Sequence, residues 1–490
     1  MSRKGALALA LSANLALAVA GCDGPGDPIK ITRSAGGGDP SAPETPLTAF
    51  GHLPLSIRAP GAPVDATVSI GGQPAYNVGP DPRARGRLVA TPMGQAAPGP
   101  ADIVISWEGG ELSYPEALQF AGPIDPLFDR YASFGASLTQ GIQSGSLGPH
   151  GQLATAAVLI ARQAGAYAGV PLVKPDLLPL VEPGDLTPDC EIQEGRDIPS
   201  RFAEAMGLLV DDETGVLDLR EVRVAPASEV RNVGVGGSNL PDILNGAGQG
   251  SEPALAFMEH LAWDPETSNL FDAVSASPER SQIEMIEQIQ PTLVVSLDML
   301  DNELMDPVTR TDDPANAQVP TAEELRPDTE ELVRRAAAAA GQVFIGDVPP
   351  VSFLPEVRRR AQRIGKTDLS HIDSAIDEIN AMLRQVAAEY DNVHIVGINV
   401  MAREVLVAGV ELADGTRLTG DFLGGLLSLD HTHFSDSGYA LMANAFLDAI
   451  EEATGVQVPR VDLDAVAAQD PVGPLLLQPP PCSATVQSAQ

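Results

Sequence analysis

Residues 323–347 read EELRPDTEELVRRAAAAAGQVFIGD, a helical run followed by a short apolar strand. Residues 373–396 repeat this order of helix and strand, and residues 436–453 form one more helical run near the end of the chain. Upstream, residues 293–297 read LVVSL, a continuous apolar strand. Strands that alternate with helices of this length are typical of a mainly parallel sheet with helices on both faces. The sequence therefore predicts an α/β fold for the larger part of the chain.

The composition limits the classes of function. The chain has 490 residues, and 30 Lys and Arg against 66 Asp and Glu give a formal net charge of −36. A nucleic-acid phosphate backbone requires clustered basic side chains, so we exclude nucleic acid as a partner. Hydrophobic residues make up 44% of the chain, which is enough for a sizeable core. At roughly 100–200 residues per domain, the length of the chain predicts two or three domains.

The first 22 residues have the pattern of a secretory signal. Arg3 and Lys4 precede an apolar run over residues 6–20, which is too short to span a bilayer. The run ends in Val-Ala-Gly-Cys at residues 19–22, which resembles a bacterial lipobox. That resemblance implies lipidation of Cys22 and a lipid-anchored protein of the bacterial cell envelope, facing the periplasm or the exterior. An ordinary signal peptide with a chance cysteine is the alternative.

Two further cysteines, Cys190 and Cys482, could form a disulfide in an oxidising compartment. This bond would attach the Pro-rich C-terminal tail, residues 457–490, to the body of the protein. No cysteine cluster indicates a metal site.

The region before the α/β part is predicted to hold a linker and a small β domain. Residues 23–46 are rich in Gly, Pro, Ser and Asp, as in a flexible linker. Residues 47–122 contain short alternating runs, with Gly-Gly turns at 71–72 and 109–110. We expect a small β-sandwich there, and residues 68–120 resemble an immunoglobulin-like module of the IPT/TIG type.

Two separated segments contain candidate catalytic residues. Residues 134–141, FGASLTQG, place Ser137 in a tight Gly-rich turn after an apolar strand, where a hydroxyl would be exposed. Residues 428–439, SLDHTHFSDSGY, place Asp430 three residues before His433. In a turn, this spacing lets the carboxylate accept from Nδ1–H and leaves the other ring nitrogen free to deprotonate a hydroxyl.

With these residues the sequence resembles the GDSL/SGNH family of serine hydrolases. Ser137 falls at the position of the family's nucleophile, and Asp430 and His433 fall at its terminal Asp-x-x-His. The resemblance implies a flavodoxin-like three-layer sandwich over residues 123–456, with insertions near 176–230 and 301–320. It also implies hydrolysis of carboxylic esters through an acyl-enzyme, without a cofactor.

The resemblance extends to the oxyanion hole, with departures. Residues 232–237, NVGVGG, have the spacing of the family's second block and place Gly237 as a backbone donor. Ala136 stands where the family has Asp. The family's oxyanion-hole Asn is either Asn302, shifted by one position, or is replaced by Asp301. A carboxylate at that point would repel the oxyanion, and losing one donor typically costs about 10²–10³ in turnover.

We therefore expect a membrane-anchored, extracytoplasmic serine hydrolase of lipid, short-chain acyl or acetyl-sugar esters. Activity should fall below roughly pH 6–7, as His433 becomes protonated. A catalytically impaired surface lipoprotein, which uses the same fold for binding or a structural role, is the alternative function. A metal site formed by Asp430, His431 and His433 is an alternative for the second segment.

Overall fold

The computed structural model divides the chain into two compact units, residues 1–121 and 122–490. It describes residues 29–31, 47–82, 84–144, 146–174, 223–225, 228–246, 280–309 and 311–471. The expected signal segment and most of the expected insertion at 176–230 lie outside these residues, as do Cys22, Cys190 and Cys482. Within the described ranges, no helix has the length and apolar character needed to cross a membrane.

The first unit contains two β-sheets that share one core. In sheet order, one sheet consists of β1 (Ile29–Ile31), β3 (Leu55–Arg58), β7 (Arg87–Thr91) and β6 (Tyr76–Pro80). The other consists of β2 (Leu47–Thr48), β9 (Gly110–Ala121), β8 (Gly99–Trp107), β4 (Thr67–Ile70) and β5 (Gln73–Pro74). Alternate residues of both sheets, such as Ile57, Ile103 and Ile105, are fully buried in one cluster. This is the packing of a β-sandwich.

One strand of this unit lies in the segment that we expected to be a linker. Residues Ile29–Ile31 pair antiparallel with β3, and Ile29 lies opposite Ile57. A composition-based interpretation of residues 23–46 does not detect so short a strand.

The second unit is built on a parallel sheet. Its strands, in order, are β10 (Tyr131–Phe134), β13 (Leu293–Ser296), β14 (Gln342–Gly346) and β15 (Val393–Val396). All residues of β10 and β13 are buried, as expected for strands covered on both faces. The backbone around Asn232 continues the sheet beyond β10, because Ser133 N donates to Arg231 O and Val233 N donates to Ser133 O.

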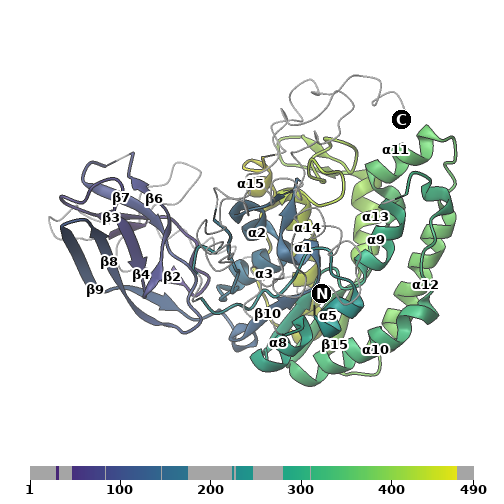
Figure 1. Ribbon diagram of the computed structural model, residues 1–490, viewed down its shortest axis with the longest axis horizontal. Helices are drawn as coiled ribbons and strands as arrows, with labels where there is room; N and C mark the ends of the chain where they lie inside the picture. The colour runs from purple at the N-terminus through teal and green to yellow at the C-terminus, as the bar shows by residue number, and fades with distance from the viewer. Residues whose placement is uncertain are drawn as a thin grey trace, which may run out of the picture. The chain divides into compact units, whose positions relative to one another are not determined.

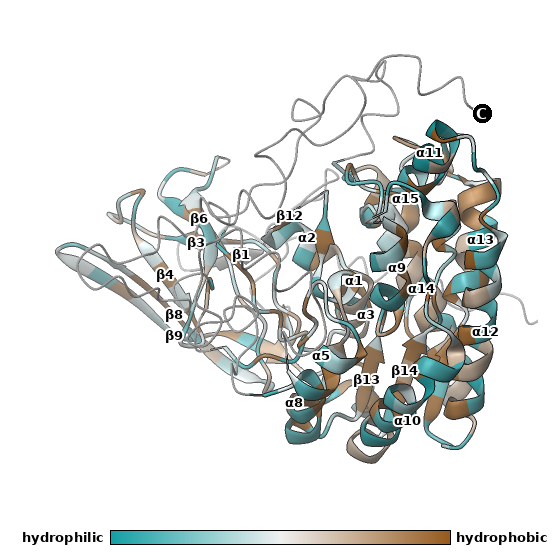
Figure 2. Cartoon of the chain, turned by 45° about the vertical axis from the view of Figure 1, so that its right-hand side comes forward, coloured by the Kyte–Doolittle hydropathy of each residue, from teal (hydrophilic) through white to brown (hydrophobic). Residues whose placement is uncertain are grey.

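Helices form two groups around this sheet (Figure 1). One group contains α5 (Leu240–Asn245), α8 (Gln282–Ile289), α10 (Ala322–Ala339) and α12 (Ser370–Ala387). The other contains α2 (Pro149–Ala154), α3 (Ala156–Ala164), α13 (Ile398–Ala408), α14 (Asp436–Thr454) and α15 (Leu463–Ala467). Figure 2 shows the apolar strands β13 and β14 among helices that carry both hydrophilic and hydrophobic residues. The mixed α/β class and the parallel strands predicted from the sequence are therefore confirmed.

Shorter elements connect these layers. They are η1 (Pro126–Phe128), α1 (Ser137–Gln140), β11 (Ile142–Gln143), β12 (Ser146–Leu147), α9 (Asp301–Thr309), η4 (Pro314–Asn316), η5 (Val351–Phe353), α11 (Pro355–Arg363), β16 (Val410–Glu411) and β17 (Arg417–Leu418). The expected insertion at 301–320 thus begins with a regular helix, α9.

The C-terminal boundary differs from the expected one. We expected a tail from residue 457, but Val458 and Val461 are buried and helix α15 follows them. The buried Asp470 carboxylate accepts hydrogen bonds from the N–H and the hydroxyl of Ser437, at 2.9 and 2.7 Å. The folded unit therefore extends at least to Asp470, because its carboxylate accepts hydrogen bonds from the first turn of α14.

Candidate active site

Ser137 is the first residue of α1, in the turn that follows the buried strand β10. Gly135, two residues earlier, has φ +141°, a conformation that a residue with a side chain rarely adopts. A Cβ atom at Gly135 would lie 2.4 Å from Oδ1 of Asp298 and 2.6 Å from Oγ1 of Thr139. Glycine is therefore required here because a buried carboxylate fills the space beside the turn.

The carboxylate of Asp298 binds this turn from the end of β13. Oδ1 accepts from Ala136 N at 2.8 Å and from Thr139 Oγ1 at 2.7 Å, and Oδ2 accepts from Leu138 N at 2.6 Å. Burial raises the pKa of Asp298, while its hydrogen bonds with this turn act in the opposite direction. We assigned no role to this residue from the sequence, although an acidic side chain directly after the apolar run LVVSL was a visible signal.

Asp430 and His433 form a hydrogen-bonded pair in the turn before α14. Asp430 Oδ2 lies 2.8 Å from His433 Nδ1. Oδ1 of the same carboxylate accepts from the backbone N–H groups of His433 and Thr432, at 2.9 and 3.0 Å, and from the Ser428 hydroxyl at 3.1 Å. The ring of His433 is thereby oriented with Nε2 directed away from the carboxylate.

The environment of His433 raises its pKa. Burial by itself lowers the pKa of the imidazole, but the adjacent carboxylate of Asp430 raises it by charge and by hydrogen bonding, and Asp298 adds to this effect. The net result is a base with a higher proton affinity than free histidine, held by a carboxylate as in a catalytic triad.

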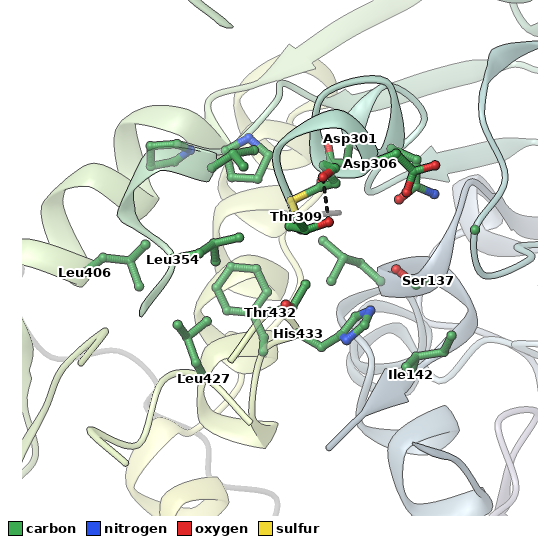
Figure 3. Close-up of a pocket in the computed structure, with 18 residues that line it drawn as sticks. Ser137, Ile142, Asp301, Asp306, Thr309, Leu354, Leu406, Leu427, Thr432 and His433 are labelled. Atoms are coloured by element: carbon green, nitrogen blue, oxygen red, sulfur yellow. Dashed lines mark hydrogen bonds between the residues drawn. The ribbon is translucent and has the colours of Figure 1, made fainter. Parts of the chain in front are cut away.

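Ser137 and His433 line the same cavity, which has a volume of about 230 Å³. Figure 3 shows the imidazole of His433 beside Ser137 at one end of it. The two side chains, both in the described part of the chain, have no hydrogen bond to each other in this arrangement; such bonds often tighten only when substrate is bound. The cavity wall also contains the three candidate oxyanion-hole residues, Gly237, Asp301 and Asn302.

The loop of Gly237 is attached to the nucleophile turn. Asn232 Nδ2 donates to Thr139 O at 2.9 Å, and Gly236 N donates to Gln140 Oε1 at 2.7 Å. Gly237 itself has φ +81°, a conformation that favours glycine, although no atom lies within 4 Å of the position that a Cβ would take. Two segments almost 100 residues apart in sequence are thus held together at the cavity.

Asp301 and Asn302 begin helix α9, and both line the cavity. The Asn302 amide donates to Ser238 O at 2.7 Å, so one of its two N–H groups is engaged in the wall. Burial raises the pKa of Asp301 well above its ordinary value, and the carboxylates of Asp298 and Asp347 raise it further. The uncharged carboxyl form of Asp301 is therefore favoured, and this form can donate a hydrogen bond.

The remainder of the cavity is mainly apolar. Figure 3 shows Leu354, Leu406 and Leu427 at the end away from Ser137. The other apolar lining residues are Leu138, Ile142, Met305, Pro349, Pro350, Val351 and Phe434. Within the described part of the chain, no Lys or Arg borders this cavity. Such a surface suits an uncharged, apolar group. We did not predict Leu354 or Leu406 as site residues from the sequence.

His431 is the other histidine of this segment. Its ring contacts the ring of Phe422, with centroids 4.3 Å apart, and its φ is +63°. Among the residues that the structure describes, no group of three or more His, Cys, Asp or Glu side chains is arranged to hold a metal ion.

Comparisons with known proteins find distant similarity to solved structures. No protein-family model matches the sequence, and no curated protein matches it. A solved structure of an α/β hydrolase from the metagenome of Lake Arreo, Spain, is 13% identical, with a TM-score of 0.31 over 65% of this chain and 93% of the other. A carbohydrate acetylesterase from Xanthomonas citri is 12% identical, with a TM-score of 0.18 over 71% of this chain and 75% of the other.

Proposed function

We propose that the protein is a serine esterase in which Ser137 is the nucleophile, His433 the general base and Asp430 the orienting acid. One observation carries the proposal: a hydroxyl on a strand-to-helix turn and a carboxylate-bound imidazole line a single cavity. This is the arrangement required for nucleophilic catalysis, in which the base is oriented by a third group.

The reaction would proceed in two steps. Nε2 of His433 takes the proton of Ser137 as Oγ attacks the ester carbonyl, and the protonated imidazole then donates that proton to the departing alcohol. Water, deprotonated by the same nitrogen, attacks the acyl-enzyme and releases the carboxylic acid with Ser137 restored. Throughout, the carboxylate of Asp430 stabilises the imidazolium that forms.

Backbone and side-chain donors around the cavity would stabilise the oxyanion. The N–H groups of Ser137 and Gly237 are the backbone candidates, and Asn302 or the uncharged carboxyl of Asp301 is the third. A neutral carboxyl at this position does not repel the oxyanion, whereas a carboxylate would. A buried carboxyl that remains protonated and donates to an oxyanion has precedent in other enzymes.

The walls of the cavity favour esters with an apolar group. The leucines opposite Ser137 would accommodate an uncharged acyl or alcohol group of several carbons, at about 0.8 kcal/mol for each buried CH₂. With no basic side chain among the described lining residues, anionic substrates lack a charge partner. We therefore propose medium-chain apolar esters over acetylated sugars.

The location proposed for this activity rests on sequence alone. The basic and apolar segment before Cys22 supports lipid attachment and a place in the bacterial cell envelope. Incorporation of labelled palmitate into the wild-type chain, and its loss in Cys22→Ser, would test the anchor. Palmitate incorporation that is unchanged in Cys22→Ser would contradict it.

Hydrolysis of p-nitrophenyl acetate, butyrate, octanoate and palmitate by the full chain in mild detergent tests the activity. We expect octanoate or butyrate to give the highest kcat/KM, and Ser137→Ala to lose at least about 10⁴-fold in kcat. Labelling by a fluorophosphonate probe should disappear in the same variant. Hydrolysis that is unaffected in Ser137→Ala, or no labelling of Ser137, would remove the esterase assignment.

A further inference from the structure

We propose that Asp298 is a positioning residue for this reaction, because its carboxylate holds the turn that carries Ser137. The inference rests on the proposed esterase function. It assigns a role to a side chain that does not line the cavity and therefore does not touch substrate.

Asp298 accepts hydrogen bonds from the residues on both sides of Ser137 in the sequence. The N–H groups of Ala136 and Leu138, directly before and after Ser137, both donate to it, one to each carboxylate oxygen. The Ser137 N–H lies between these two bonded groups in the chain, and it is a proposed oxyanion donor. Fixing both neighbours therefore fixes the directions of the Ser137 side chain and amide together, as preorganised catalysis requires.

The residues around the Asp298 carboxylate bury it and leave room for it beside the nucleophile turn. Asp298 is 1% exposed, and Thr139 of α1 contributes a third donor. Gly135 leaves room for Oδ1 where a Cβ atom would come within 2.4 Å of it. Ala136, at the position where the resembled family has an acidic side chain, is fully buried. The acid that contacts this turn thus comes from the end of a neighbouring strand.

Asp298 also affects the pKa of His433, the proposed general base. Its charge adds to that of Asp430 in raising the pKa of His433. Its charge also raises the pKa values of Asp301, at the start of α9, and of Tyr439, in α14. Removal of the charge at Asp298 should therefore lower the pKa of His433, whereas a purely structural role would leave this pKa unchanged.

A second buried aspartate provides a matched control. Asp347 follows β14 as Asp298 follows β13, and it is also 1% exposed. Its carboxylate accepts from the backbone N–H of Asn399 at 2.7 Å and from Arg384 at 3.0 Å. It therefore serves the start of α13 instead of the nucleophile turn, and it does not line the cavity.

The test compares Asp298→Asn and Asp347→Asn in the full chain, with p-nitrophenyl butyrate as the substrate. The asparagine NH₂ replaces one acceptor oxygen, so at least one donor of the turn loses its partner. We expect Asp298→Asn to lower kcat by about 10–100-fold with little change in KM, and to shift the acid limb of the rate profile to lower pH. Asp347 raises the pKa of Asp301 as Asp298 does, so Asp347→Asn controls for that shared effect. It should leave the acid limb in place and lower kcat much less than Asp298→Asn does, even where it lowers Tm.

A milder variant tests the proposal even if Asp298→Asn does not fold. Thr139→Val removes one donor to Asp298 but keeps the carboxylate and both backbone bonds. It should lower kcat by about 2–10-fold and leave the acid limb in place. If Asp298→Asn does not fold, wild-type kcat in Thr139→Val overturns the inference. Wild-type kcat and acid limb in a folded Asp298→Asn also overturn it, whereas loss of Ser137-dependent activity in the wild type overturns the proposed function as well.

Discussion

One carboxylate, that of Asp430, binds both the ring and the backbone of His433. Oδ2 lies 2.8 Å from Nδ1, and Oδ1 lies 2.9 Å from the backbone nitrogen. The imidazole therefore has a fixed tautomer as well as a fixed direction, because Nδ1 must carry the proton that the carboxylate accepts.

The first prediction concerns this pair. Asp430→Asn should lower kcat by about 10⁴-fold, because an amide no longer enforces the tautomer or stabilises the imidazolium. The variant should remain folded, since the amide oxygen can still accept from the backbone. Ser428→Ala is the control: it removes one hydrogen bond to Asp430 and should cost less than about tenfold. An Asp430→Asn enzyme with near-wild-type kcat would contradict the assigned triad.

The second prediction is the position of the acid limb. Catalysis requires neutral His433, and the folded environment raises the pKa of this group. Activity should therefore fall as pH is lowered through a value above the ordinary histidine pKa of about 6.5. A profile of kcat/KM against pH between 5 and 9 measures this limb. A limb well below pH 6 would show that another group is the base.

The third prediction distinguishes the two forms of Asp301. Burial raises its pKa, so the carboxyl donates a hydrogen bond below that pKa and becomes a repulsive anion above it. Asp301→Asn should retain activity and lose any alkaline decline, because an amide stays neutral. Asp301→Ala should lower kcat by about 10²-fold if the carboxyl is the third oxyanion donor. Equal, wild-type rates in both variants would assign that position to Asn302.

The fourth prediction concerns chain-length preference. Leu354→Trp should reduce the volume at the far end of the cavity and lower kcat/KM for the octanoate ester by about tenfold relative to the acetate ester. Val400→Trp is a suitable control, because this side chain of α13 is 60% exposed and does not border the cavity. An unchanged ratio in Leu354→Trp would place the acyl group elsewhere.

The fifth prediction links stability to pH through Glu303. Its carboxylate accepts from Leu240 N at 2.7 Å, yet burial, with the nearby Asp242, Asp306 and Asp328, raises its pKa to about 7. Because the folded pKa lies above the unfolded one, the stability that Glu303 contributes is present below about pH 4.5 and is lost as pH rises through 7. Glu303→Gln should therefore gain about 2–3 kcal/mol over wild type at pH 8 but not at pH 4. Thermal unfolding at both values tests this, and equal gains would contradict it.

Much of the fold could be predicted from local sequence. Runs such as 293–297 are almost entirely apolar because both faces of their strands are covered. This pattern does not depend on how the covering helices are arranged. The pair Asp430 and His433 was also visible, because three residues in one turn suffice to bring a carboxylate to an imidazole. The proximity of Ser137 to this pair rested on a family resemblance, and nothing local indicates it.

Tertiary structure decided the remaining features. Asp298 lies 162 residues from Ala136, and only the parallel pairing of β10 with β13 brings its carboxylate to the nucleophile turn. Leu354 and Leu406, in the apolar wall of the cavity, are also far from Ser137 in sequence, so no spacing rule identifies them. The charge state of Asp301 likewise depends on burial and on carboxylates from other strands. Sequence determined which segments are strands and helices and which groups can react; packing determined which of those groups meet and in what protonation state.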